Sequence, residues 1–260
     1  DLITLRVRFT VLNRVIGNGE GPVLHDKVGD RRISPWVRIL KISIIERTEH
    51  LMNSVYFARD LVNEPANVLT PAELAYRTKN DLSEAGVKVT IWRKKDLEKN
   101  NMHAVLAVGR ASSQEPRLIK MHYKPKGKAK KKIALVGKGV TYDSGGLSIK
   151  PTSSMLDMKI DMTGAATVIG TIKAAALAKL PVEIIRLVPA VENSIAGNSY
   201  KPGDVISTYS GKTIEVMDTD AEGRIILADA LKLASEMEPD EIFDFATLTG
   251  ACVVALGNFT

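Results

Sequence analysis

The sequence predicts an α/β fold: a mixed, mostly parallel sheet covered by helices on both faces. Two observations predict it. From about residue 60 onward, segments of helical composition alternate with apolar, strand-like segments. Several of these strands, such as 132–137 and 182–190, are continuous apolar runs. Continuous apolar strands are typical of sheets that are buried on both faces.

The first expected elements follow from turn and cap residues. Thr70 and Pro71 are typical of a helix N-cap and first helical position, and Gly86 ends that helix before a strand at 87–92. Strands at 116–123 and 132–137 flank a lysine-rich stretch and indicate a hairpin. After a long glycine-rich loop we expect a helix from about Asp161 to Leu180. The last expected elements are strands at 182–190 and 213–218, a helix at 221–237 and a strand at 241–248.

Residues 1–50 differ from the rest of the chain. They contain short apolar runs and several basic residues without a clear period. We interpret them as the remnant or edge of a separate N-terminal region, and we expect one domain at 51–260.

Composition excludes several classes. With 45% hydrophobic and 25% charged residues, the chain is ordinary for a soluble protein, and no apolar run approaches the roughly 20 residues of a membrane span. The N-terminus has no signal-peptide pattern. The single cysteine, Cys252, lies in an apolar run, so we expect a buried, inert thiol and no disulfides. A cytoplasmic location is the expectation.

The net charge of +6 and the pI near 9.3 raise the question of nucleic acid as a partner. The strongest basic run is KPKGKAKKK at 124–132. It lies between two expected strands, and it contains no aromatic residue on which a base could stack. We therefore favour a solvated hairpin tip over a nucleic-acid site.

Four carboxylates stand out near the expected strand ends. Asp220 and Glu222 lie in the stretch VMDTDAEGR, Asp143 follows the strand at 132–137, and Asp161 opens a helix. Each acid near a helix start can be explained as a cap or as a complement to the helix dipole. Together they come from three expected strand ends of one sheet, where ligands of such folds bind. Because four unpaired buried acids would be very costly, a site for two divalent cations is the consistent solution.

The residue types narrow the chemistry of this site. Oxygen ligands without histidine or cysteine suit magnesium, manganese or zinc, and two such ions would hold a bridging hydroxide for hydrolysis. The four histidines are scattered and form no HExxH motif, which excludes a zincin. The glycine-rich loop after residue 137 leaves a phosphate-binding hydrolase as an alternative, although it does not fit the Walker pattern.

Several motifs carry a family resemblance. The sequence resembles the leucine aminopeptidase family, the dinuclear-metal cytosol aminopeptidases of peptidase family M17, over roughly residues 55–260. The motifs that carry it are LVNEPANVLTP, VGKGVTYDSGGLSIKP, MKIDMTGAA, DTDAEGR and FATLTGA.

The resemblance implies a metal-dependent aminopeptidase that releases leucine-like N-terminal residues from peptides. It implies two divalent ions, zinc or manganese with magnesium or cobalt as alternatives, and a neutral lysine as one ligand. Lys150 would stay protonated and polarise the scissile carbonyl. The implied metal ligands are Lys138, Asp143, Asp161, Asp220 and Glu222.

The resemblance also implies a bicarbonate ion, held by Arg224, as the general base. The alternative is that Arg224 simply pairs with Asp218 or Asp220. The implied substrate-binding residues, each with core packing as its alternative, are Met158, Thr247, Leu248 and Gly250.

Two departures from the family pattern are visible. Asp218 stands where asparagine is common in the family, and we expect it to serve as an extra hydrogen-bond acceptor near the ligands. Family members also continue beyond the final ALGNFT, so we expect an incomplete, C-terminally truncated metallopeptidase domain at 51–260. The resemblance further implies a homohexamer built from trimers.

Overall fold

The computed structural model describes residues 35–257 of the chain. The chain divides into two units between Ile45 and Glu46. Helix α2 covers Pro35–Asn63, so the domain boundary expected at 50/51 lies inside a helix. The unit that begins at Glu46 holds the sheet and every proposed site residue.

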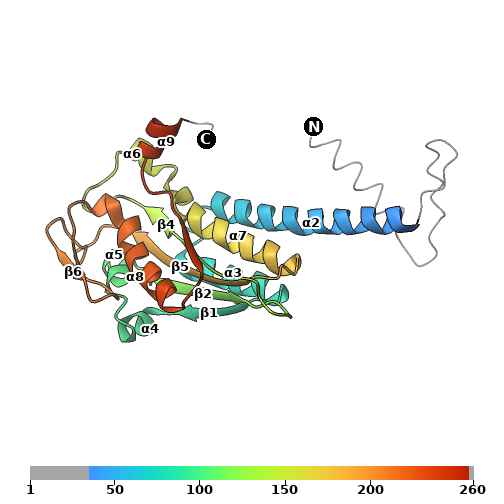
Figure 1. The fold of residues 1–260 in the computed structure, drawn as a ribbon. Coiled ribbons are helices and arrows are strands. Elements are labelled where there is room, and N and C mark those ends of the chain that lie inside the picture. Colours follow the sequence, from blue (N-terminus) through green and yellow to red (C-terminus); the bar gives the residue numbers. More distant parts are fainter. Residues whose placement is uncertain (1–34, 258–260) are drawn as a thin grey trace. The chain divides into compact units, whose positions relative to one another are not determined.

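The main sheet has six strands in the order β1-β2-β5-β3-β8, and β4 pairs with the last part of β5 (Figure 1). Strands β3 and β4 run parallel to β5, and β8 runs parallel to β3, whereas β2 is antiparallel to both β1 and β5. The mixed α/β class predicted from the sequence is confirmed. The strands are β1 Lys88–Trp92, β2 Arg117–Tyr123, β3 Lys132–Gly137, β4 Gly139–Asp143, β5 Glu183–Asn193 and β8 Glu241–Phe245.

The expected hairpin between 116–123 and 132–137 is wrong, because β5 lies between β2 and β3. The lysine-rich segment instead crosses the start of β5, where the Lys130 amide donates to the Pro181 carbonyl (2.9 Å) and the Glu183 amide donates to the Lys131 carbonyl (2.9 Å). Nine of the eleven β5 residues are buried, which requires hydrogen-bonded neighbours on both sides.

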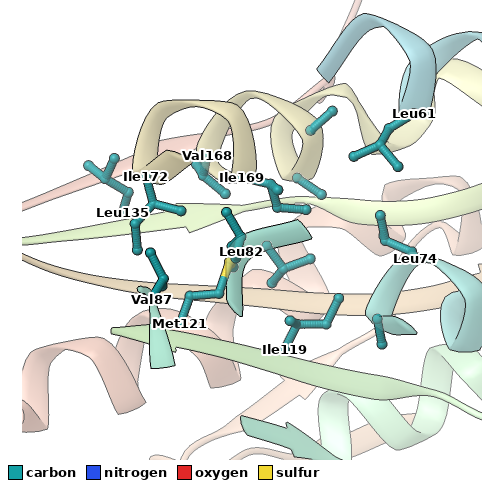
Figure 2. Packing of buried hydrophobic residues seen from close by; sticks show 14 of the residues in the cluster. Leu61, Leu74, Leu82, Val87, Ile119, Met121, Leu135, Val168, Ile169 and Ile172 are labelled. Carbon is teal, nitrogen blue, oxygen red and sulfur yellow. The ribbon is translucent and has the colours of Figure 1, made fainter. Parts of the chain in front are cut away.

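Helices cover both faces of the sheet. On one face, α3 (Pro71–Glu84), α7 (Thr163–Leu177) and the C-terminal part of α2 enclose an apolar cluster, part of which Figure 2 shows. On the other face, α4 (Lys94–Lys99), α5 (His103–Gly109) and α8 (Glu222–Glu236) enclose a second cluster. The stretch Met158–Leu177 is long and apolar enough for a membrane span, but 61% of it is buried inside the protein.

Local signals in the sequence predicted the start of helix α3 correctly. The Thr70 hydroxyl accepts a hydrogen bond from the Glu73 amide (3.2 Å), and Pro71 is the first residue of α3, as predicted. Gly86, with φ of 75°, turns the chain into β1. The helix expected at 161–180 is in fact a 3-10 turn, η1 (Met158–Met162), followed by α7.

Two further expectations need correction. The segment after β3 is not only a loop, because it contains β4. The strand expected at 213–218 is the short β7 (Thr213–Glu215), which pairs only with β6 (Val205–Ser207) in a separate two-stranded sheet. Consequently Asp220 and Glu222 do not follow a strand of the main sheet. They lie in the 3-10 turn η2 (Thr219–Ala221) and at the first position of α8.

The last strand and helix expose apolar side chains. On β8, Ile242, Phe243 and Phe245 are 39%, 47% and 38% exposed. In α9 (Ala251–Leu256), Cys252 is exposed and donates to the Thr249 carbonyl. The expectation of a buried thiol is therefore wrong, because α9 does not pack into either apolar cluster.

Candidate metal centre

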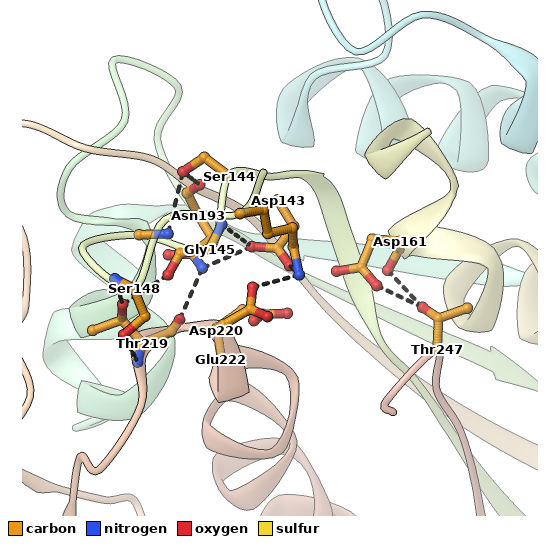
Figure 3. A network of polar contacts seen from close by, with 12 residues as sticks. Asp143, Ser144, Gly145, Ser148, Asp161, Asn193, Thr219, Asp220, Glu222 and Thr247 are labelled. Atoms are coloured by element: carbon orange, nitrogen blue, oxygen red, sulfur yellow. Dashed lines mark hydrogen bonds and ion pairs between the residues drawn. The ribbon is translucent and has the colours of Figure 1, made fainter. Parts of the chain in front are cut away.

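The five expected metal ligands come from four places around one end of the sheet, and Figure 3 shows the four carboxylates among them. Lys138 links β3 to β4, and Asp143 ends β4. Asp161 lies in η1, just before α7, whereas Asp220 and Glu222 lie at the start of α8. Because β3, β4 and β5 run parallel, their carboxyl ends open on the same side, and the two helix starts reach this side from either face.

Lys138 joins two of the carboxylates. Its Nζ lies 2.7 Å from Asp161 Oδ1 and 2.8 Å from Glu222 Oε1, and it donates to the Thr247 carbonyl at 2.7 Å. The side chains of Lys138, Asp161 and Glu222 are all nearly or fully buried. Lys138 is therefore the charge that holds η1 against the first turn of α8.

Lys150 joins the other two carboxylates. Its Nζ lies 3.0 Å from Asp143 Oδ2 and also forms an ion pair with Asp220 Oδ1. The two groups of acids are close to each other, because ligand oxygens of Asp143, Asp220 and Glu222 all lie within 4.8 Å of one another. The structure thus brings all four predicted carboxylates together, each beside one of two lysines.

The arrangement fits divalent cations on its own chemistry. Asp161 Oδ2 and Glu222 Oε2 are buried and have no hydrogen-bond partner among the described residues. Two lysines also leave four carboxylates with an excess of negative charge, which is costly in a buried site. Carboxylate oxygens and a lysine amine suit hard or borderline divalent ions. Bound cations would satisfy both the free oxygens and the charge.

The pKa shifts point the same way. Burial, together with Asp143 and Asp161, raises the pKa of Glu222 to about 8 in spite of Lys138. Burial lowers the pKa of each lysine, but the neighbouring carboxylates outweigh it, so both Lys138 and Lys150 have raised pKa values. In the protein alone Lys138 is therefore an ammonium. It can become the neutral ligand implied by the resemblance only where a cation supplies the positive charge instead.

A second layer of polar groups orients Asp143. Its Oδ1 accepts hydrogen bonds from the Gly145 amide and from Asn193 Nδ2, both at 2.8 Å. Asn193 is fully buried and also donates to the Thr219 carbonyl (3.0 Å). Sequence reasoning missed Asn193, although a polar residue at the end of the apolar strand β5 was a usable signal. Such supporting bonds fix the direction in which a ligand oxygen points.

Two glycines are required by this geometry. A Cβ on Gly223 would lie 2.7 Å from Lys138 Cε and 2.9 Å from its Nζ. Gly145 has φ of 87°, and a Cβ there would lie 2.4 Å from the Ser148 carbonyl oxygen. Lys138 therefore passes directly over the first turn of α8, and the loop after Asp143 can close only with glycine.

The glycine-rich loop is folded onto itself rather than open for phosphate. The Gly145 amide is used by Asp143, and the Gly146 amide donates to Ser144 Oγ (3.2 Å). The Ser148 amide donates to Thr219 Oγ1 (2.8 Å), and the Lys150 amide to the Ser144 carbonyl (3.0 Å). A phosphate cradle needs free amides that converge on one point, so this loop does not support that alternative.

The remaining expected site residues surround the carboxylates less tightly. The Thr247 hydroxyl donates to Asp161 Oδ1 (2.8 Å), so it contacts a proposed ligand directly. Met158 is half-buried in η1, Leu248 is 41% exposed, and Gly250 immediately precedes α9. The substrate contacts expected of these four residues therefore stay predictions.

Arg224 and Asp218 lie beside the cluster. Arg224 is exposed, and within the described part of the chain it forms no ion pair with Asp218 or Asp220. The simple pairing considered for Arg224 is therefore not what the structure contains. Asp218 accepts a hydrogen bond from the Asp220 amide (2.8 Å), which is the acceptor role expected for it.

Comparison with known proteins agrees with the motifs. A model of the cytosol aminopeptidase family, catalytic domain, matches residues 56–260. The chain belongs to this family. The matched residues include both lysines and all four carboxylates described above.

Individual relatives show how much of the family the chain covers. A probable cytosol aminopeptidase of Clostridium tetani is 50% identical over 240 residues, which is 88% of this chain and 50% of the relative. Another, of Chlorobaculum tepidum, is 55% identical over 202 residues, which is 77% of this chain and 40% of the relative. The crystal structure of a cytosol aminopeptidase from Coxiella burnetii is 44% identical, with a TM-score of 0.78 over 88% of this chain and 50% of that one. The chain spans about half the length of these relatives.

Proposed function

We propose that this chain carries the catalytic centre of a metal-dependent aminopeptidase that releases leucine-like residues from the N-termini of peptides. The observation that carries the proposal is the convergence of four carboxylates, among which Asp161 Oδ2 and Glu222 Oε2 are buried without a hydrogen-bond partner among the described residues. The membership of the cytosol aminopeptidase family supports it.

Five residues would hold the two ions. Lys138, Asp143, Asp161, Asp220 and Glu222 are the proposed ligands, with zinc or manganese as the expected metals and magnesium or cobalt as alternatives. When bound, the ions would supply a hydroxide nucleophile at neutral pH and would polarise the scissile carbonyl. Asn193 and Gly145 hold Asp143 Oδ1, which leaves its other oxygen directed toward the cluster.

Lys150 is the proposed electrophilic residue. Its raised pKa keeps it protonated at neutral pH, and its ammonium lies beside both Asp143 and Asp220. There it would donate a hydrogen bond to the oxygen that becomes negative in the tetrahedral intermediate. Arg224 is the proposed holder of a bicarbonate general base, because its exposed guanidinium carries no carboxylate partner among the described residues.

Substrate contacts and assembly complete the proposal. Met158, Thr247, Leu248 and Gly250 are proposed to bind the N-terminal residue of the peptide. Size selection by such a pocket is weak, about 1 to 3 kcal/mol per methylene. A cytoplasmic homohexamer is proposed from the family resemblance, and light scattering of the purified protein tests it.

The test is hydrolysis of leucyl-p-nitroanilide by the full-length protein. We expect a chelator to abolish turnover and manganese or zinc to restore it. Asp143→Asn should lose both turnover and bound metal, whereas Glu215→Gln, which changes an exposed acid on β7, should keep both. A metal-loaded protein that leaves such amides intact would refute the proposed activity.

The role of Arg224 has its own test. If it holds bicarbonate, Arg224→Ala should lower turnover and remove the response to added bicarbonate, while bound metal stays unchanged. Unchanged turnover and an unchanged bicarbonate response would show that another group is the general base.

A further inference from the structure

A basic cavity lies at the end of the sheet opposite the carboxylates. Strands β3 and β5 start there, with Lys132 and Glu183 as register partners, and they end at the proposed metal centre. The cavity has a volume of about 420 Å³, within the range of small-molecule sites. Nothing in the proposed aminopeptidase chemistry uses this end of the sheet.

Strand alternation places the basic residues on one face. Lys120 and His122 alternate with buried Ile119 and Met121 along β2, so they point to the opposite side of the sheet. Lys88 on the neighbouring β1 is the register partner of His122, and all three residues line the cavity. The face is open here because α8, which covers it further along, ends at Glu236.

The charges of the cavity do not cancel. Four lysines and a single carboxylate line it. That carboxylate, Glu183, is engaged by His122 Nε2 at 2.7 Å and lies 3.9 Å from Lys124 Nζ. Lys132 Nζ donates to the Met237 carbonyl at the end of α8. The cavity therefore keeps an excess of positive charge.

Two of the lysines have no anionic partner. Among the residues that the structure describes, no carboxylate pairs with Lys88 or Lys120. The Lys120 ammonium lies 4.0 Å from the centroid of the Trp92 ring, and burial lowers its pKa. A half-buried ammonium held against an aromatic face can donate a charge-assisted hydrogen bond to an incoming anion.

We propose that this cavity binds a small diphosphate-bearing anion through Lys88, Lys120 and Lys132. The lysines converge on one concave site, which suits a compact anion with several charges better than an extended backbone. Thr90, which also lines the cavity, adds a hydroxyl donor. The exposed lysines of the crossing segment at 124–131 would attract the anion to the site.

Calorimetric titration of the full-length, metal-free protein with pyrophosphate tests the site. Lys120→Gln and Lys88→Gln should each weaken binding by about tenfold, because each removes one charge-assisted contact. Lys79→Gln removes an exposed lysine of α3 outside the cavity and should leave binding unchanged. Since Lys88 is exposed, its variant should fold normally and keeps the test decisive.

Three results would overturn the proposal. They are no heat of binding with pyrophosphate, an equal loss in Lys79→Gln, or retained binding in both cavity variants. A parallel titration with a nucleoside diphosphate distinguishes the source of the diphosphate, since tighter binding than pyrophosphate assigns the site to a nucleotide. Binding of a single-stranded oligonucleotide in place of pyrophosphate, insensitive to Lys120→Gln, would also reject the cavity and favour a surface contact along 124–131.

Discussion

The two ends of the main sheet hold lysines in opposite surroundings. At the carboxyl ends of β3 and β4, Lys138 and Lys150 each lie between two carboxylates, and acids outnumber bases. At the start of β3 and β5, lysines outnumber acids, and two of them lack an anionic partner among the described residues. The same residue type therefore marks a cation-binding end and a proposed anion-binding end. The identity and number of the neighbouring counter-charges decide which kind of ion each end would bind.

The comparison also explains a misleading bulk property. The net charge of +6 suggested a polyanion partner for the whole chain. The structure separates the charges, with the densest acids buried around the proposed metal centre and many lysines exposed at the other end. The net charge of the chain therefore describes neither site, and each end must be tested separately.

The largest expected effect comes from the acidic end. Lys150→Met should lower kcat for leucyl-p-nitroanilide by roughly 10²- to 10³-fold, the loss typical of one oxyanion donor. Bound metal should remain, because Lys150 is not a proposed ligand. Steady-state kinetics and atomic absorption on the same preparation measure both quantities. Loss of metal in proportion to activity would show that Lys150 acts by holding Asp143 and Asp220 instead.

The next effect probes the close passage of Lys138 over α8. In Gly223→Ala the new Cβ would displace a lysine end that Asp161, Glu222 and the Thr247 carbonyl hold in place. We expect metal affinity to fall by about 10- to 100-fold, as for other changes that misplace a ligand. Competition with a chromogenic chelator measures it.

A glycine at the opposite end provides the control for that variant. A Cβ on Gly127 would meet no atom within 4 Å, so Gly127→Ala should leave metal affinity unchanged. Equal affinities for the Gly223→Ala and wild-type proteins would show that Lys138 does not belong to the metal centre.

Arg186 lies between the two ends as a third kind of cation. It is fully buried on β5, donates from one guanidinium nitrogen to the Val168 carbonyl, and has two nitrogens without partners among the described residues. Burial holds its pKa well below the usual value. Arg186→Met should raise the free energy of unfolding by about 1 to 3 kcal/mol, the cost of buried unpaired polar groups.

Urea unfolding measures this change, and Arg117→Met is the matched control. Arg117 Nη1 lies 3.0 Å from the half-exposed Glu115 carboxylate, so its loss should alter stability by less than about 1 kcal/mol. A destabilised Arg186→Met protein would mean that the guanidinium makes stabilising contacts beyond those described.

The smallest effect sharpens the basic end. Glu183→Gln removes the single carboxylate of the cavity, so pyrophosphate should bind roughly two- to fivefold more tightly, within the range of a partly exposed ion pair. Calorimetric titration detects a change of this size. Weaker binding would indicate that Glu183 positions His122 or Lys124 for the anion, and an equal gain in Glu215→Gln, which removes an exposed acid outside the cavity, would reduce the effect to bulk charge.

Local and long-range features differed in how well the sequence predicted them. The cap at Thr70 and the turn at Gly86 depend on neighbouring residues, and both were predicted correctly. The insertion of β5 between β2 and β3 was not, because strand order depends on which distant segment buries both its faces best. The short β4 was missed because glycine-rich composition outweighed its pairing with β5.

The site divides in the same way. The four carboxylates could be picked out because they fall near the expected strand ends of one sheet, and motif order then indicated Lys138 as their partner. Asn193 was missed because its role depends on a contact with a residue 50 positions away. The basic cavity was invisible as a motif, since Lys88, Lys120 and Lys132 meet only after the four strands β1, β2, β5 and β3 have paired.

The central place of β5 also has a consequence for synthesis on the ribosome. When β1 to β4 have emerged, β2 and β3 still lack the partner that joins them, and β5 appears only some residues after α7. Nascent chains at this stage present open strand edges on β2 and β3, which favour association with other chains. The strands that are synthesised first must therefore be kept apart from other chains until β5 has been made.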